Sequence, residues 1–187
     1  MDLDDLLRRC IKGDALAWEA LVRRLQGRVL GVARFYLRDR EEARDTAQEA
    51  LIRVYRSLDT FRMGTNFTAW VLRITRNCAI DRLRQLRASP QTEELPEDDL
   101  IADAACTLAQ PAGGVSENHQ LLYRAMEQMS PAHREMILLK DIQGLEQKEI
   151  AEILSLPLGT VKTRASRARI ELARRILDID PTYGALP

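Results

Sequence analysis

Apolar residues recur along most of the chain at intervals of three and four positions, the period of an α-helix that packs one side against a core. This spacing predicts helices over about residues 2–11, 15–35, 41–58 and 66–87, and further helices between about residues 117 and 177. No stretch alternates apolar and polar residues with the Val, Ile and Thr enrichment of a strand. The predicted fold class is therefore all-α.

The sharpest local pattern lies between Gly144 and Ile176, where two helical segments flank a break at Ser155 to Pro157. In the second segment, about 100° per residue gives one apolar stripe: Val161, Ala165, Ala168, Leu172 and Ile176. The opposite side carries Thr163, Ser166, Arg167 and Arg174, with Lys162, Arg164 and Arg169 at its flanks. An apolar back with a basic, hydroxyl-bearing front suits a helix that lies in a DNA major groove. The alternative is an ordinary amphipathic surface helix.

Charge divides the chain more sharply than the net value of zero suggests. Residues 1–90 carry 18 Lys and Arg against 12 Asp and Glu, whereas residues 91–120 carry 7 acids and no Lys or Arg. Within 160–176 there are six basic residues and a single acid, Glu171. Two basic segments separated by an acidic connector indicate two contacts with a polyanion such as nucleic acid.

Several other classes of protein are disfavoured by the composition. No apolar stretch approaches the ~20 residues of a membrane-spanning helix, and the acidic, amphipathic N-terminus is unlike a secretory signal. Three widely spaced cysteines (Cys10, Cys78 and Cys106) and two histidines give no zinc-ligand spacing, which favours reduced thiols and a cytoplasmic protein. Without a nucleophile–base pair, a metal motif or a Gly-rich phosphate loop, we expect no enzyme activity, catalytic residue, cofactor, metal or small-molecule substrate.

The helix predicted over residues 41–58 has a packing side rich in alanine and an opposite side that is polar. Ala43, Ala47, Ala50, Leu51, Val54 and Leu58 make the packing side, and small alanines allow helices to approach closely. The polar side presents Asp45, Gln48, Glu49 and Arg53. From the residues alone, this side is either a binding surface or a solvated face with a weak Glu49–Arg53 ion pair at i,i+4 spacing.

The helix predicted after the loop at residues 59–65 has Thr65 or Asn66 as its N-cap. Phe67, Val71, Ile74 and Cys78 form its inward ridge. A second arc, interrupted by Ile80, collects Trp70, Arg73, Arg76, Asn77, Arg84 and Arg87. Arginines can hold phosphates, an aromatic ring can stack on a base and an amide can read a base edge, so the arc suits single-stranded DNA. Trp70 could equally be a core residue.

Three motifs together resemble the small extracytoplasmic-function group of bacterial sigma factors. E-I-A-x-x-L-x-x-P-x-G-T-V-K-T-R-x-x-R-A-R, from Glu149, resembles their promoter-reading helix-turn-helix. D-x-x-Q-E-x-x-x-R, from Asp45, resembles the helix that docks on the clamp coiled coil of the largest polymerase subunit. F-x-A-W-x-x-R-I-x-R-N-x-A-I-D-x-L-R, from Phe67, resembles the segment that captures the melted minus-ten element.

The resemblance implies an alternative sigma factor of the bacterial cytoplasm that binds core RNA polymerase, including its flap region, and promoter DNA. Such factors usually have an anti-sigma factor as a further partner. The polymerase-binding residues would be Asp45, Gln48, Glu49 and Arg53, and the minus-ten residues Phe61, Asn66, Trp70, Arg73, Arg76, Asn77 and Arg84. The minus-thirty-five residues would be Thr160, Lys162, Thr163, Arg164, Ser166 and Arg167.

The same resemblance divides the chain into two small helical domains joined by a linker. Residues 1–88 would form sigma domain 2, and residues 117–177 the helix-turn-helix sigma domain 4. The acidic, Pro- and Gly-containing segment 89–116 would be the linker, either a plain tether or a strand threaded near the RNA path of polymerase, and 178–187 a frayed tail.

Two positions depart from the family pattern. Glu146 stands where many relatives have a helix-capping Ser, although we expect the helix still to form. Ser166 occupies a groove-facing position that is often larger, so base preference cannot be transferred from the family. The alternative functions are a stand-alone helix-turn-helix transcription regulator and a helical interaction protein that never touches nucleic acid.

Overall fold

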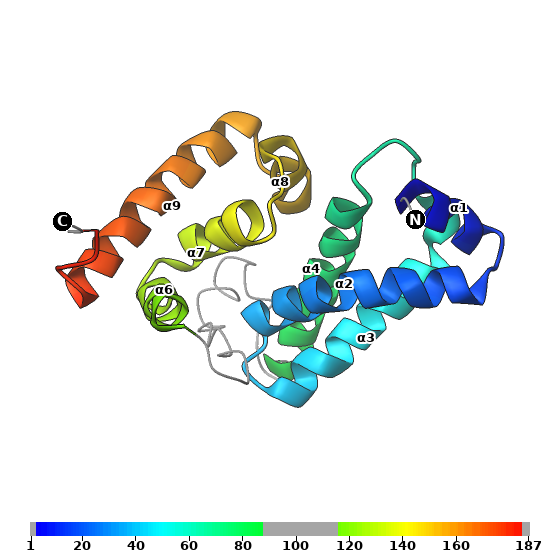
Figure 1. The fold of residues 1–187 in the computed structure, drawn as a ribbon, viewed down its shortest axis with the longest axis horizontal. Helices are drawn as coiled ribbons and strands as arrows, with labels where there is room; N and C mark the ends of the chain where they lie inside the picture. The colour runs from blue at the N-terminus through cyan, green and yellow to red at the C-terminus, as the bar shows by residue number, and fades with distance from the viewer. Residues whose placement is uncertain (1–2, 88–115, 185–187) are drawn as a thin grey trace. The chain divides into compact units, whose positions relative to one another are not determined.

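The computed structural model describes residues 3–87 and 116–184, and the chain divides into two compact units at Arg87 (Figure 1). In both described ranges the regular structure is helical, which confirms the all-α prediction. Residues 89–115 of the predicted acidic linker, Cys106 among them, lie outside the described residues.

The first unit begins with two helices joined by a tight turn, α1 (Leu3–Ile11) and α2 (Ala15–Tyr36). Gly13 has a φ of 84°, a conformation that favours glycine, and Asp14 follows as the N-cap of α2. The Asp14 carboxylate accepts hydrogen bonds from the backbone N–H groups of Leu16 and Ala17, at 3.0 and 3.1 Å. Asp14 therefore fixes the start of α2.

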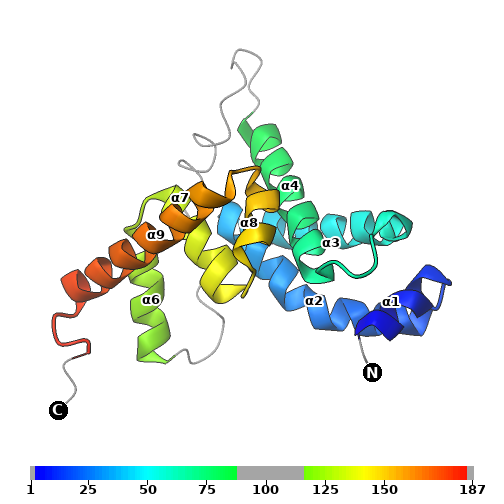
Figure 2. The same ribbon diagram turned by 90° about the horizontal axis from the view of Figure 1, so that it is seen from above.

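Three long helices form the body of this unit: α2, α3 (Arg40–Arg56) and α4 (Phe67–Arg87). Each of the three packs on the other two, while α1 packs on α2 (Figure 2). The buried alanines Ala43, Ala47 and Ala50 let α3 approach its neighbours closely, as their spacing predicted. A short 3-10 turn, η1 (Leu58–Thr60), begins the loop that leads to α4.

An aromatic cluster attaches that loop to α4. The ring of Phe61 lies 4.9 Å from that of Phe67 and 5.3 Å from that of Trp70, measured between centroids. Phe61 is only 6% exposed. Such tilted and edge-to-face contacts stabilise the fold beyond the burial of apolar area alone, and they hold the loop against the first turn of α4.

The second unit consists of α6 (Glu117–Glu127), α7 (Pro131–Ile137), the π-helical turn η2 (Leu138–Ile142), α8 (Gln147–Leu154) and α9 (Leu158–Ile179). Pro131 is the first residue of α7, a position where its missing N–H costs nothing, and Gly144 ends the following turn with a φ of 70°. The long helix α9 packs against α6, α7 and α8. It extends to Ile179, beyond the predicted domain end at residue 177.

Two polar features of this unit were not predicted. Arg134 is buried, and its guanidinium donates hydrogen bonds to the backbone carbonyls of Met129, at 2.9 Å, and Glu127, at 3.3 Å. It therefore ties α7 to the end of α6. After α9, the Asp180 carboxylate accepts a hydrogen bond from the backbone N–H of Thr182 at 3.0 Å, so residues 180–184 form a turn where a frayed tail was expected.

No helix within residues 3–87 or 116–184 combines the length and the apolar character needed to cross a lipid bilayer.

Candidate nucleic-acid and polymerase interfaces

The exposed side of α9 is set by the residues it buries. Val161, Ala165 and Ala168 lie in the core of the second unit, so the opposite side of the helix is free of protein contacts from that core. The predicted groove-facing residues lie there: Thr160, Lys162, Thr163, Ser166 and Arg167 are exposed, and Arg164 is half-buried. The Thr163 hydroxyl donates to the Gly159 carbonyl at 3.0 Å, which leaves its oxygen free to accept from a ligand.

The turn between α8 and α9 depends on one strained residue. Ser155, the C-cap of α8, has φ 51° and ψ 41°, the left-handed conformation that is rare outside glycine. At the other end of α8, the Glu149 carboxylate accepts a hydrogen bond from the Glu146 backbone N–H at 2.7 Å. The helix begins at Gln147, so Glu146 is tolerated as its N-cap in place of the family's Ser.

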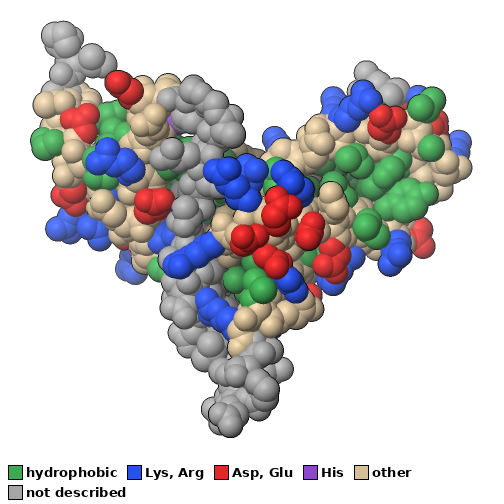
Figure 3. All heavy atoms as spheres, turned by 90° about the horizontal axis from the view of Figure 1, so that it is seen from below, with side chains coloured by type: hydrophobic (Ala, Val, Ile, Leu, Met, Phe, Trp, Pro, Cys, Tyr) green, Lys and Arg blue, Asp and Glu red, His purple; other side chains and the backbone are tan. Residues whose placement is uncertain are grey.

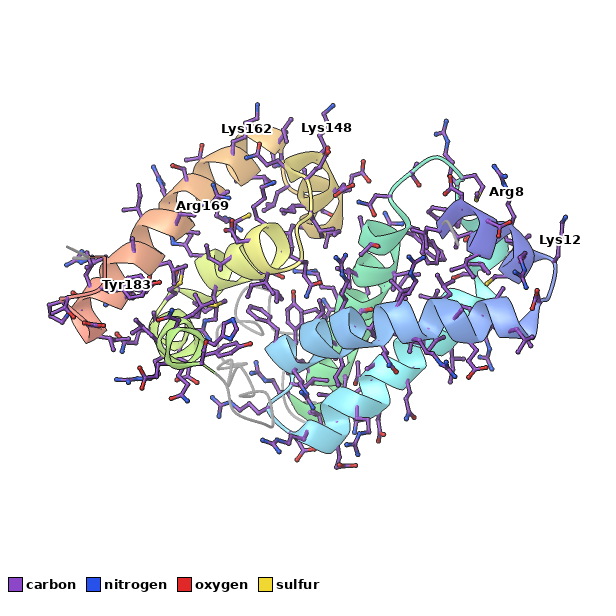
Figure 4. The ribbon with its side chains drawn as sticks, in the orientation of Figure 1. Arg8, Lys12, Lys148, Lys162, Arg169 and Tyr183 are labelled. Atoms are coloured by element: carbon purple, nitrogen blue, oxygen red, sulfur yellow. The ribbon has the colours of Figure 1, made fainter. Side chains whose placement is uncertain are left out.

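A further basic residue adjoins this side of the unit. Lys148 on α8 and Lys162 on α9 project the same way in Figure 4, and both line a shallow hollow of about 400 Å³. Lys148 was not predicted as a site residue, although its exposed position on the first helix of the helix-turn-helix was visible in the sequence. Arg169, by contrast, is held by Asp141 at 2.5 Å.

In the first unit, the outward side of α4 is narrower than the predicted arc. Arg73, Asn77 and Arg84 are exposed, and Trp70 is half-buried against the aromatic cluster. Asn66 is exposed and acts as the N-cap, because its side-chain oxygen accepts from the Ala69 backbone N–H at 3.2 Å. These five predicted minus-ten residues therefore remain accessible, wholly or in part.

Two of the predicted minus-ten residues, Phe61 and Arg76, are buried. Phe61 lies in the aromatic cluster, where contact with the rings of Phe67 and Trp70 is more favourable in free energy than exposure to water. Arg76 is 5% exposed, and its guanidinium carbon lies 5.9 Å from the centroid of the Tyr36 ring on α2. On the helical wheel Arg76 lies at the edge of the arc, about 60° from Arg73, and that edge faces α2. Neither side chain is available to DNA in this arrangement.

The polar side of α3 is exposed as predicted for Asp45, Gln48, Glu49 and Arg53. Arg53 lies 2.5 Å from Glu49 and 3.4 Å from Asp81 on α4. All three side chains are about half exposed, so these ion pairs contribute only a few tenths of a kcal/mol. Figure 3 shows acidic side chains gathered on one face of this unit, with basic side chains at their edges and hydrophobic ones alongside.

The exposed hydrophobic residues nearest these charges were not predicted. Ile52 and Tyr55 on α3 are 50% and 51% exposed, and the Tyr55 ring lies 4.9 Å from that of Trp18 on α2. Half-exposed aromatic and aliphatic side chains beside charged ones are typical of protein-binding surfaces. Within the part of the chain that the structure describes, no group of three or more His, Cys, Asp and Glu side chains is placed to hold a metal ion.

Comparison with known families gives two matches, one in each unit. Residues 21–89 match the family model "Sigma-70 region 2", and residues 119–172 match "Sigma-70, region 4". The first match includes the exposed sides of α3 and α4, and the second includes α9 as far as Leu172.

Known proteins resemble the chain over most of its length. The sigma factor SigW of Bacillus subtilis is 32% identical over 181 residues, covering 92% of this chain and 96% of that protein. The sigma-E factor of Escherichia coli is 31% identical over 177 residues, covering 91% and 92%. The sigma-H factor of Pseudomonas aeruginosa is 31% identical over 170 residues and covers 88% of each.

Solved structures share the fold. CnrH, solved in complex with the cytosolic domain of CnrY, superposes with a TM-score of 0.64 at 24% identity and covers 95% of this chain and 97% of that one. RpoE of Bartonella quintana, solved with the anti-sigma factor NepR, gives a TM-score of 0.62 at 24% identity and covers 87% and 97%.

Proposed function

Since the chain belongs to the extracytoplasmic-function group of the sigma-70 family, we propose that the exposed sides of α3, α4 and α9 divide between them the work of an alternative sigma factor. The protein is a specificity subunit for transcription initiation that acts with core RNA polymerase on promoter DNA, and it is not an enzyme. The observation that supports separate binding roles for these helices is that each of the two units has a polar, accessible helix side.

The polar side of α3 is the polymerase contact in this proposal. Asp45, Gln48, Glu49 and Arg53 are all accessible, and the adjoining Ile52 and Tyr55 supply apolar area. A protein interface is usually dominated by a few such side chains, with weak ion pairs at its rim. Because the Glu49–Arg53 pair is exposed, a partner can replace it at little cost.

The outward side of α4 captures the unpaired minus-ten strand. We keep Asn66, Trp70, Arg73, Asn77 and Arg84 for this role and leave out the buried Phe61 and Arg76. Arginines hold the backbone, Asn77 can read a base edge, and the exposed part of Trp70 can stack on a base. A surface that binds the unpaired strand more tightly than the duplex shifts the melting equilibrium towards the open promoter.

The exposed side of α9 reads the minus-thirty-five duplex through Thr160, Lys162, Thr163, Arg164, Ser166 and Arg167. Its exposed N-terminal half suits insertion into the major groove. With about five or six phosphate contacts, the logarithm of the affinity should fall with the logarithm of salt concentration with a slope of roughly −5.

We place sigma domain 2 at residues 1–88, a linker at 89–116 and sigma domain 4 from 117 to the end of α9 at Ile179, with residues 180–187 as a tail. We further propose that the protein works in the bacterial cytoplasm, where its polymerase and promoters are, and that an anti-sigma factor regulates it. The RpoE structure supports the last point, because a protein of the same fold is bound there by an anti-sigma factor.

Run-off transcription with core RNA polymerase on a library of random promoters tests the proposal and yields the promoter sequence. The protein should select a two-part motif, and core polymerase alone should select none. A stand-alone regulator would instead bind a specific duplex tightly in a gel shift without polymerase and would start no transcripts. That result would overturn the proposal.

A further inference from the structure

The second unit has a hollow beside the groove-facing side of α9 that includes a histidine outside every predicted site. Its volume is about 520 Å³, and it is lined by Ala132, His133, Gly159, Thr160, Thr163, Arg164 and Arg167. Two walls therefore meet here: the first turn of α7 and the first half of α9. Arg164, Arg167 and the Thr160 hydroxyl can donate hydrogen bonds into the hollow, which makes it a candidate anion site.

His133 is held in place from behind by Glu171, which projects from α9. The Glu171 carboxylate lies 2.5 Å from His133 Nδ1, and it accepts hydrogen bonds from the Ser130 backbone N–H at 3.0 Å and the Ser130 hydroxyl at 3.3 Å. Burial alone would raise the pKa of Glu171, but the hydrogen bonds from His133 and Ser130 outweigh it and the pKa is lowered. The carboxylate is therefore ionised and fixed.

This arrangement decides which nitrogen of His133 can meet a ligand. An ionised carboxylate only accepts hydrogen bonds, so Nδ1 must carry the proton that it donates to Glu171. The other ring nitrogen, Nε2, is left for the hollow. A phosphate in the hollow would place a second anion beside Nε2, and a ring held between a carboxylate and a phosphate binds as the imidazolium, which donates from both nitrogens.

We propose that this hollow seats a backbone phosphate of the minus-thirty-five DNA and that His133 Nε2, together with Arg164 and Arg167, donates to it. This inference rests on the proposed role of α9, because the hollow opens beside the residues that would enter the major groove. Phosphate contacts fix the register of a reading helix without specifying sequence. His133 would thus set where α9 lies in the groove.

The test uses the full chain with core polymerase and promoter duplexes in which single phosphates of the minus-thirty-five region are replaced by neutral methylphosphonates. In the wild type, neutralising one particular phosphate should weaken promoter binding by about three- to tenfold. His133→Asn is the informative variant, because its side-chain amide can replace Nδ1 towards Glu171 but cannot replace Nε2. This variant should bind the normal promoter about three- to tenfold more weakly, and neutralising the same phosphate should weaken it no further.

The chain offers a matched control in His119, an exposed histidine on α6 that does not line the hollow. His119→Asn should leave the affinity and every methylphosphonate effect as in the wild type. Thermal unfolding monitored by circular dichroism should show His133→Asn to be as stable as the wild type, whereas His133→Ala should lose stability through the unpaired Glu171.

The assignment of His133 is wrong if each methylphosphonate weakens His133→Asn as much as the wild type. A wild-type protein that directs no transcription with core polymerase would overturn the proposed function itself, and the role of the hollow with it. The two failures are therefore distinguishable.

Discussion

The carboxylate of Glu42 on α3 accepts two hydrogen bonds from the guanidinium of Arg82 on α4, at 2.5 and 2.7 Å. This two-pronged contact joins residues 40 positions apart, and both side chains are partly covered by protein. Glu42 lies one turn before Asp45, and Arg82 lies beside Asp81, which contacts Arg53. The pair therefore fixes the helix proposed to bind polymerase against the helix proposed to bind the unpaired strand.

Glu42→Gln should lower the melting temperature of the first unit by a few degrees, because the variant loses a two-pronged charged contact. The effect should depend on pH in one direction. The hydrogen bond from Arg82 holds the pKa of Glu42 below its ordinary 4.5. The contribution of this pair to the free energy of unfolding is therefore fully present above pH 4.5 and is lost as the pH falls through the lowered pKa. The difference in melting temperature between neutral and acidic pH should therefore be smaller in Glu42→Gln than in the wild type.

Glu41→Gln is the matched control, because Glu41 is exposed and its ion pair, at 3.1 Å, is with the nearby Arg44 on the same helix. It should melt within a degree or so of the wild type. Equal losses in the two variants would show that the contact with Arg82 does not fix α3 against α4.

Arg76 and Arg73 lie one turn apart on α4, and substituting them should have opposite effects: one on stability and the other on DNA binding. Arg76→Ala removes a buried side chain that contacts Tyr36, so it should destabilise the first unit by roughly 2–3 kcal/mol in denaturant unfolding. Arg73→Ala should leave stability unchanged, within about 0.5 kcal/mol, because Arg73 is exposed. It should instead weaken the binding of a minus-ten single strand by holoenzyme several-fold. An exposed role for Arg76 would require the opposite pattern.

The contrast between these two arginines shows where sequence reasoning worked and where it stopped. Caps and breaks depend on neighbouring residues, so a cap at Thr65 or Asn66 and a break at Ser155 to Pro157 could be predicted. The helical wheel also separated the buried and exposed sides of α3 and α9. It could not say how wide the exposed side of α4 is, because that depends on where Tyr36 of α2 lies. Likewise, His133 and Glu171 are 38 positions apart, and only the fold brings them together.

Polymerase binding and promoter choice should be separable by mutation. Gln48→Ala should weaken the binding of core polymerase by about tenfold, as expected for a central interface residue, and leave the selected promoter motif unchanged. Arg167→Ala should retain polymerase binding and lose discrimination at the minus-thirty-five element. Because Arg167 also donates to a phosphate in the proposed site, the log–log slope of the salt dependence should be shallower by about one unit. Titration with labelled core polymerase and library transcription measure the two effects. Unchanged promoter selectivity in Arg167→Ala would contradict the groove-facing assignment.

Ser155→Gly should stabilise the helix-turn-helix without changing what it reads. Ser155 adopts φ 51°, which costs a residue with a Cβ about 1 kcal/mol relative to glycine, although glycine loses part of this gain through its greater freedom in the unfolded chain. The net gain should be about 0.5 kcal/mol, seen as slower hydrogen exchange of the amides in α8 and α9.

Ser155→Val should have the opposite effect and cost about 1 kcal/mol or more, because a β-branched side chain resists this conformation more strongly. Since Ser155 is the C-cap of α8 and glycine can keep the same backbone angles, the direction of α9 and the selected minus-thirty-five motif should stay the same. A changed motif in Ser155→Gly would mean that the serine side chain itself, and not the left-handed turn, sets the position of the reading helix.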